Sequence, residues 1–167
     1  AAAAALAVDL ANWLAELEVP PFDDRLAVTA VALLPQLSAA EWAPLIDRED
    51  FAALPTFAGQ AAETGVLARH AGDPGLAFLL SDGQRIQARL AARLPELRWL
   101  AAGLADPSRL SALVDATAVA AGCGLARVET ARGTLLHRIE LAADCVEDYQ
   151  IIAPTEWNFH PQGAFDS

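Results

Sequence analysis

The stretch that decides the fold runs from Val128 to Gly163 and reads VETARGTLLHRIELAADCVEDYQIIAPTEWNFHPQG. From Thr134 to Leu141 the side chains alternate, with Leu135, His137 and Ile139 on one side and Leu136 and Arg138 on the other. This period of two is typical of a strand. A second run, Val146 to Ala153, is rich in β-formers, and the short segment between the runs suits a hairpin connection. The stretch therefore predicts an antiparallel β-hairpin.

The open ends of such a hairpin lie side by side, because antiparallel strands of equal length bring the start of one beside the end of the other. This places Arg132-Gly133, before the first strand, near Pro154-Thr155, after the second. A guanidinium and a hydroxyl then meet at one corner, and Gly133 permits a close backbone approach by a bound group. A corner of this kind suits a small anion.

The same residues resemble the central signature of the large subunit of nickel-iron hydrogenases. In that signature an acidic residue precedes an Arg-Gly pair, a His follows, and a Tyr-Gln strand leads into Pro-Thr/Ser-x-Trp-Asn. A second block of that family resembles Pro55 to Gly59 followed by Glu63 to Arg69. Together the two blocks make the resemblance specific, and it spans roughly Pro55 to Gly163.

The resemblance implies roles for single residues. In the family, the Arg and the Ser or Thr donate hydrogen bonds to cyanide ligands on iron, so the implied ligand-binding positions here are Arg132, Pro154 and Thr155. The positions implied to shape the pocket are Glu129, Gly133, His137, Trp157 and Asn158.

The family's catalytic subunits hold nickel and iron with two Cys-x-x-Cys pairs, which supply the soft thiolates that these metals bind. This sequence has only Cys123 and Cys145, and they form no such pair. We therefore expect no dinuclear site, no bound nickel and no catalysis from the chain as given. The two cysteines remain the only metal candidates, and Cys123 is expected to lie near a helix C-terminus.

Residue by residue, other interpretations stay open. Arg132 could pair with Glu129, which is close in sequence. Thr155 could stabilise a turn through its own backbone, and His137 is favoured as a buried, hydrogen-bonded core histidine rather than a metal ligand. Glu63 and Arg69, taken without the resemblance, are favoured as solvated charges; with it, the implication is that their segment packs against the signature hairpin.

Composition bounds the class of protein. The 167 residues fit a single domain, 1–167, and carry a formal charge of −11. Phosphate binding depends on basic surface, so we expect neither nucleic acid nor an anionic membrane as a partner. No apolar run reaches the length of a membrane-spanning helix. Two lone cysteines fit a reducing cytoplasm.

Apolar periodicity predicts that residues 1–121 are mostly helical. Expected helices run over residues 1–18, from Asp24 to Leu34, from Ser38 with a capping box, over 84–104 with a bend at Pro95, and over 106–122. Arg85, Arg89 and Arg93 form a basic stripe on the fourth of these, either solvated or a docking surface for an acidic partner. With the signature hairpin at 125–157, the predicted fold is α+β, a predominantly helical bundle ending in an antiparallel hairpin, like a reduced hydrogenase large subunit.

We therefore expect a hydrogenase maturation or assembly factor, resembling the non-catalytic scaffold relatives of the large subunit. It would carry the iron-cyanide-carbonyl fragment transiently and bind maturation chaperones and the hydrogenase large-subunit precursor. One alternative is a fragment of a catalytic large subunit whose Cys-x-x-Cys motifs lie outside this sequence. Another is an interaction protein with a degenerate pocket.

Overall fold

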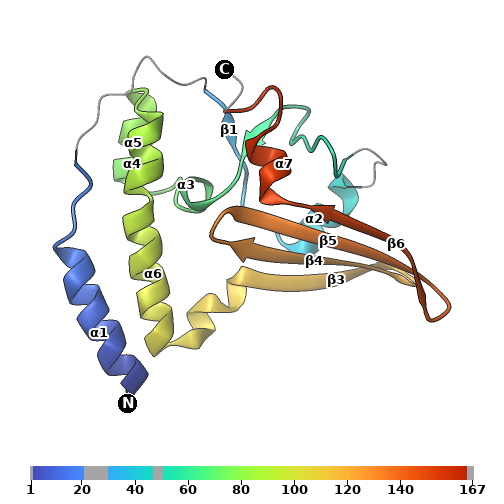
Figure 1. Cartoon of the computed structure of the whole chain (residues 1–167), viewed down its shortest axis with the longest axis horizontal. Coiled ribbons are helices and arrows are strands. Elements are labelled where there is room, and N and C mark those ends of the chain that lie inside the picture. Colours follow the sequence, from blue (N-terminus) through green and yellow to red (C-terminus); the bar gives the residue numbers. More distant parts are fainter. Residues whose placement is uncertain (1, 21–29, 47–50, 165–167) are drawn as a thin grey trace.

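A four-stranded antiparallel sheet and a layer of helices build the molecule (Figure 1). The computed structural model describes residues 2–20, 30–46 and 51–164. The helices are α1 (Ala2–Ala15), α2 (Ala39–Trp42), α3 (Val66–Arg69), α4 (Pro74–Ser81), α5 (Arg85–Ala91), α6 (Arg93–Ala105) and α7 (Pro154–Asn158), with 3-10 helices η1 (Ala43–Leu45) and η2 (Pro107–Leu113). The strands are β1 (Ala32–Leu33), β2 (Ala62–Glu63), β3 (Val114–Ala120), β4 (Cys123–Thr130), β5 (Gly133–Ala142) and β6 (Cys145–Ile152).

The predicted hairpin exists as β5 and β6, with His137 opposite Ile151. It forms half of a meander in the order β3-β4-β5-β6. The helix expected over 106–122 is wrong: Asp106 does cap a helix, but this is the short 3-10 helix η2, and β3 follows it. The alanines of β3 mislead, because alanine is a strong helix former that packs in a strand when its neighbours require it.

The expectation of a predominantly helical bundle is also wrong, because residues 114–152 form a four-stranded antiparallel sheet instead of packing as helices. The α+β class itself holds. Of the predicted helices, α1 is present, and the Ser38 capping box is present at the start of α2. The helix expected from Asp24 lies partly outside the described residues, and its described end forms β1, which runs parallel to β2.

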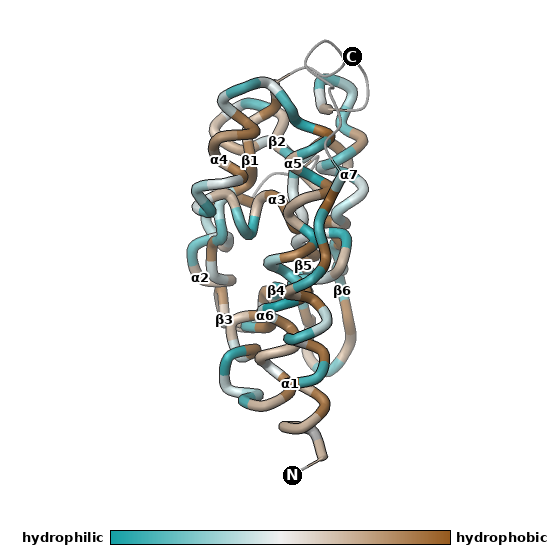
Figure 2. The backbone as a smooth tube through the Cα atoms, turned by 90° about the vertical axis from the view of Figure 1, so that its left-hand side faces the viewer, coloured by the Kyte–Doolittle hydropathy of each residue, from teal (hydrophilic) through white to brown (hydrophobic). Residues whose placement is uncertain are grey.

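The long helix expected over residues 84–104 is broken at Ala92 into α5 and α6. Pro95 falls in the first turn of α6, where a missing backbone N–H leaves no helical hydrogen bond unmade. α1 packs along α6, and the Arg98 guanidinium donates to the Leu14 carbonyl at 3.1 Å. Both views place α1 at one end of the molecule and β1, β2 and α7 near the other (Figures 1 and 2). No helix in the described part of the chain is both long and apolar enough to traverse a bilayer.

One face of the sheet builds the core. Leu125 of β4, Leu136 of β5 and Ile152 of β6 are buried there against Trp42 of α2 and Trp157 of α7. The Ala39 backbone N–H at the start of α2 also donates to the Asp115 carboxylate of β3 at 2.6 Å. Trp42 and Trp157 thus fix their helices, α2 and α7, to the same sheet face. Helix α7 begins directly after β6 ends.

Candidate functional site

A pocket of about 320 Å³ lies where the β4–β5 turn meets the start of α7. Ala131 and Arg132 form the turn, and Pro154 and Thr155 are the first residues of α7. The structure therefore brings Arg132 and Pro154-Thr155 to one pocket, as the hairpin geometry predicts. The remaining lining residues are Glu63, Thr64, Gly65, Val66, Leu67, Arg89, Arg93, Asn158 and Phe159.

Two glycines let the hairpin turn approach the segment that precedes α3. Gly133 has φ +132°, and a Cβ there would lie 2.4 Å from the Thr64 methyl carbon. Gly65 has φ +123°, and a Cβ there would lie 3.2 Å from the Arg132 carbonyl oxygen. Both dihedrals favour glycine. Gly133 thus permits the approach of Thr64 and Gly65 of the chain itself, which corrects the expectation that it makes room for a bound group.

Hydrogen bonds fasten this contact. The Thr134 backbone N–H donates to the Thr64 hydroxyl at 3.0 Å, and the two hydroxyls lie 3.2 Å apart. The Thr64 backbone N–H donates to the Asn158 side-chain oxygen at 2.9 Å, and the Asn158 amide nitrogen donates to the Arg132 carbonyl at 3.4 Å. Asn158 therefore ties both walls of the pocket to α7.

Glu129 lies behind the pocket rather than in its wall. Its carboxylate accepts bonds from Arg69 at 2.8 Å, from Arg127 at 3.2 Å and from the Thr134 hydroxyl at 2.7 Å. These partners settle one alternative, because Glu129 does not pair with Arg132. Glu129 reaches the pocket wall through Thr134, which is bonded to Thr64.

The same buried network reaches Glu96 of α6. Arg69 bonds the two Glu96 oxygens at 2.6 and 3.4 Å, and His70 lies 2.7 Å from Glu96. Burial alone would raise the pKa of Glu96, but the hydrogen bonds from Arg69 and His70 outweigh it and leave that pKa below its ordinary value. Burial likewise works against the Arg69 charge, yet Glu96 and Glu129 raise the Arg69 pKa. The solvated charge favoured for Arg69 without the resemblance is therefore wrong, and the packing of its segment against the signature hairpin, which the resemblance implies, is confirmed.

Arg132 and Thr155 present unused donors to the pocket. Both residues are exposed. Among the described residues, the Arg132 guanidinium has no ion pair, and the Thr155 hydroxyl has no hydrogen bond to its own backbone or to any other described group. Pro154 is buried at the first position of α7 and fixes the direction in which the chain leaves β6. The corner can therefore donate several hydrogen bonds to a small acceptor-rich group.

Two further arginines of the pocket were predicted only as part of a surface stripe. Arg89 binds the Glu63 carboxylate in a two-point pair, with both nitrogen–oxygen distances 2.7 Å. Glu63 is 7% exposed, so it is not the solvated charge expected from its sequence context alone. Arg93 is exposed and lines the same pocket as Arg132. Helical periodicity grouped these arginines, but nothing in the sequence showed that they face the signature hairpin.

Two predicted pocket-shaping residues lie elsewhere. His137 is on the uncovered sheet face, where its Nδ1 is 2.6 Å from the Tyr149 hydroxyl and the two rings stack with centroids 5.8 Å apart. It is half-buried and does not line the pocket, which corrects both its pocket-shaping role and its expected burial in the core. Trp157 is buried beside Trp42, with ring centroids 5.7 Å apart. Its side chain packs α7 onto the core, and it is not among the residues that line the pocket.

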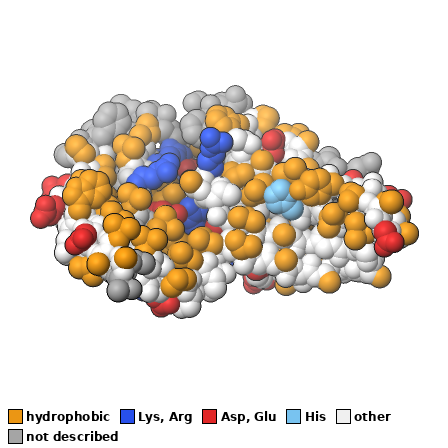
Figure 3. Space-filling model, turned by 60° about the horizontal axis from the view of Figure 1, so that its bottom comes forward, with side chains coloured by type: hydrophobic (Ala, Val, Ile, Leu, Met, Phe, Trp, Pro, Cys, Tyr) orange, Lys and Arg blue, Asp and Glu red, His pale blue; other side chains and the backbone are white. Residues whose placement is uncertain are grey.

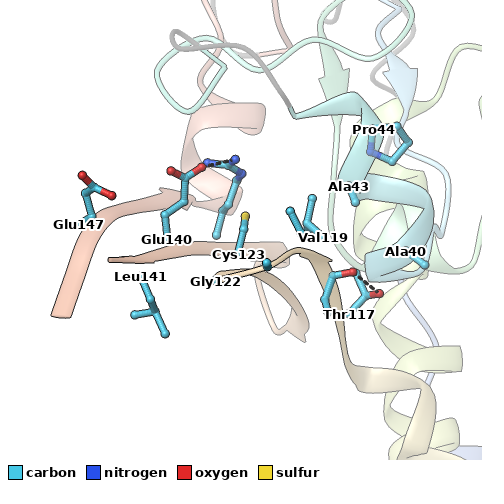
Figure 4. Close-up of a pocket in the computed structure, with 14 residues that line it drawn as sticks. Ala40, Ala43, Pro44, Thr117, Val119, Gly122, Cys123, Glu140, Leu141 and Glu147 are labelled. Carbon is cyan, nitrogen blue, oxygen red and sulfur yellow. Dashed lines mark hydrogen bonds and ion pairs between the residues drawn. The ribbon is translucent and has the colours of Figure 1, made fainter. Parts of the chain in front are cut away.

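The cysteines lie at the opposite end of the sheet, near the β3–β4 and β5–β6 turns. Cys123 opens β4 beside a hairpin turn, so the expected position near a helix C-terminus is wrong. Its side chain lies on the same side of the sheet as Glu140, in a separate pocket of about 680 Å³, while Leu141 points away (Figure 4). Both thiols are free. Across the described ranges, no three His, Cys, Asp or Glu side chains are grouped so that they could hold a metal ion.

Comparisons with known proteins place this chain beside hydrogenase-related proteins. Residues 100–167 match the family described as nickel-dependent hydrogenase. The chain is 37% identical over 129 residues to the hydrogenase expression/formation protein HupK of Rhizobium leguminosarum bv. viciae, covering 74% of this chain and 34% of that protein. It is 39% identical over 131 residues to the hydrogenase expression/formation protein HoxV of Cupriavidus necator, covering 72% and 33%. The chain spans about a third of the length of these curated relatives.

Among solved structures, the NiFeSe hydrogenase of Dm. baculatum superimposes with a TM-score of 0.50 and 23% identity. The match covers 72% of this chain and 32% of that one. This likeness concerns the fold alone, and it agrees with the predicted α+β relation to a reduced large subunit.

Proposed function

From the similarity of residues 100–167 to the nickel-dependent hydrogenase family, and of the chain to hydrogenase expression/formation proteins, we propose that it is a non-catalytic maturation scaffold. Its cargo is the iron-cyanide-carbonyl fragment of a nickel-iron hydrogenase, held in the pocket between the β4–β5 turn and α7. Arg132 and Thr155 donate to the cyanide nitrogens, Pro154 sets the position of Thr155, and Asn158 holds the turn against α7.

One observation carries the proposal: the Arg132 guanidinium and the Thr155 hydroxyl line one pocket, and neither is engaged by another described side chain. A guanidinium offers five N–H donors in a fixed plane, which suits an acceptor with several negative ends. The fit is chemical as well as geometric, because the described lining residues supply donors and no soft metal ligand.

A pocket that holds the iron fragment by hydrogen bonds, without thiolate ligands on the metal, favours transient binding. Hydrogen bonds from charged groups contribute about 1.5–3 kcal/mol each, whereas structural thiolate-rich zinc sites bind metal with about 10 kcal/mol or more. A pocket that grips only the cyanide ends would hold the fragment long enough to transfer it and would still release it. The receiving protein would then secure the metal through its own thiolates.

This function implies two kinds of partner, which belong to the proposal: the maturation chaperones that supply the iron fragment and the hydrogenase large-subunit precursor that accepts it. We place the step in the cytoplasm, because both cysteines are unpaired. The alternative of a catalytic large-subunit fragment would be favoured by Cys-x-x-Cys pairs encoded on both sides of this sequence.

The test is the Arg132→Ala variant, expressed in place of the natural protein in cells that mature a nickel-iron hydrogenase. We expect hydrogenase activity in the extract to fall at least tenfold while the protein accumulates normally. Arg109→Ala is the matched control, because Arg109 is exposed on η2 and lies outside the pocket. Full activity with Arg132→Ala would support instead the interaction protein with a degenerate pocket.

A further inference from the structure

The arginines of this protein differ in whether their charge is already used. All eleven basic residues are arginines, against 22 acidic residues. Most described arginines donate to a carboxylate or a backbone carbonyl of the chain: Arg69, Arg85, Arg89, Arg98, Arg127 and Arg138. Among the described residues, the side chains of Arg93, Arg109 and Arg132 have no such partner.

Two of these three unengaged guanidiniums line the same pocket. Arg93 is the first residue of α6, and Arg132 stands in the β4–β5 turn, so they come from elements distant in sequence. In the space-filling view, the arginine side chains that can be seen lie in one region of the surface (Figure 3). In a chain with a net charge of −11, two arginines that line one pocket without a described carboxylate partner are not explained by general surface composition.

The remaining charges of the pocket cancel. Glu63 is the one acidic residue among the lining residues, and Arg89 holds both of its oxygens at 2.7 Å. The charges of Glu63 and Arg89 therefore balance each other, and Arg93 and Arg132 leave the pocket with two unbalanced positive charges. The hydroxyl and amide groups of Thr155 and Asn158 add polar contacts without changing that balance.

We propose that Arg93 and Arg132 form a two-cation clamp and that the ligand of this pocket is a compact dianion. Arg93 is thereby a further ligand-binding residue, and the clamp selects by charge: a dianion engages both guanidiniums, whereas a monoanion leaves one of them without a counter-charge. The inference rests on the proposed function only in using the same pocket.

The clamp also constrains the proposed cargo. Ferrous iron with two cyanides and one carbonyl is electrically neutral, because the two cyanide charges balance the metal charge. A dianionic cargo must therefore reach the pocket with two further anionic donor ligands on iron, of the thiolate or hydroxide type. The clamp binds this liganded form and discriminates against the bare neutral fragment.

Isothermal titration calorimetry with two stable cyanide complexes tests the charge selection. The probes are tetracyanonickelate(II), a dianion, and dicyanoaurate(I), a monoanion, which present the same cyanide ends. We expect wild-type protein to bind the dianion roughly tenfold or more tightly than the monoanion, with the preference shrinking as salt is added.

Variants locate the effect. Arg93→Gln should weaken dianion binding roughly tenfold and remove most of the preference, Arg93→Lys should restore it, and Arg109→Gln should leave it unchanged. Equal affinity of wild type for the two probes, or wild-type binding by Arg93→Gln, would overturn the clamp.

The two proposals fail differently. Cyanide and carbonyl infrared bands of undiminished intensity on Arg93→Gln purified from maturing cells would refute the clamp and leave the scaffold function standing. Arg93-dependent binding of the dianion, together with wild-type protein that never carries those bands, would refute the scaffold function and leave the clamp standing.

Discussion

The Thr64 backbone N–H donates to the Asn158 side-chain oxygen at 2.9 Å, although the two residues are 94 positions apart. Thr64 precedes α3, and Asn158 ends α7. Through its amide nitrogen Asn158 also reaches the Arg132 carbonyl. One side chain thus connects the upstream segment, the hairpin turn and the helix that carries Thr155, and the pocket exists only while these three parts keep their positions.

Replacing Asn158 should loosen the pocket. In Asn158→Ala the Thr64 N–H, on a residue only 4% exposed, loses its acceptor, so we expect the free energy of unfolding to fall by about 1–3 kcal/mol. Asn158→Asp retains an oxygen at the same place and should lose less. Urea unfolding measures both changes, and equal stability of the alanine variant and wild type would show that the bond contributes nothing.

Gly133 should tolerate no side chain. In Gly133→Ala the new Cβ would meet Thr64 and the Gly65 nitrogen at under 3 Å, on a backbone with φ +132°. Strain and overpacking together should lower the unfolding free energy by at least about 2 kcal/mol. Gly124→Ala, in the neighbouring strand, is the control, since its Cβ would lie 3.7 Å or more from other atoms. Similar unfolding midpoints for the two variants would contradict this account of the glycine.

Acid should weaken the network behind the pocket. The pKa of Glu96 is lowered in the folded state, so its contribution to stability is present above the unfolded pKa of about 4.3 and is lost as pH falls through the folded value. Glu96→Gln should cost about 3 kcal/mol near neutral pH, because Arg69 loses a buried partner. Its stability should then decline less than that of wild type on acidification. The exposed Glu147→Gln provides the control, and parallel pH profiles for wild type and Glu96→Gln would refute the assignment.

His137 should not matter to the cargo. It lies four residues along β5 from Gly133, roughly 13 Å away. Its side chain is on the uncovered sheet face, where it contacts the Tyr149 hydroxyl. We therefore expect His137→Ala to bind the cyanide complexes as wild type does, measured by the same calorimetry. A loss comparable to that of Arg132→Ala would mean that the uncovered sheet face communicates with the pocket.

Local patterns predicted the parts of the fold whose signal is local. The alternation around Leu136 and Ile139 located β5, and antiparallel geometry alone brought Arg132 to Thr155. Strand β3 was predicted as a helix because its alanines suit a helix as well as a strand. The sheet forms from pairing with β4, as in the Asp115–Arg127 ion pair, and such pairing is invisible in a short window.

Long-range partners decided the rest of the site. Glu129 is three positions from Arg132 in sequence, yet it bonds to Arg69, which is 60 positions away. Arg93 looked like one member of a surface stripe because its spacing from Arg89 predicts that one continuous helix carries both. The structure breaks this helix at Ala92, so that Arg89 in α5 holds Glu63 while Arg93 in α6 lines the pocket without a carboxylate partner among the described residues.

The central claim is that the corner between Arg132 and Thr155 carries the iron fragment. Infrared spectroscopy tests it most directly, on wild-type protein and on Arg132→Ala purified from cells that mature an active nickel-iron hydrogenase. The account predicts cyanide and carbonyl stretching bands on the wild type and at least a tenfold loss of their intensity on the variant. Wild-type protein that lacks the bands although it binds its maturation partners, or a variant whose bands match those of wild type, would contradict it.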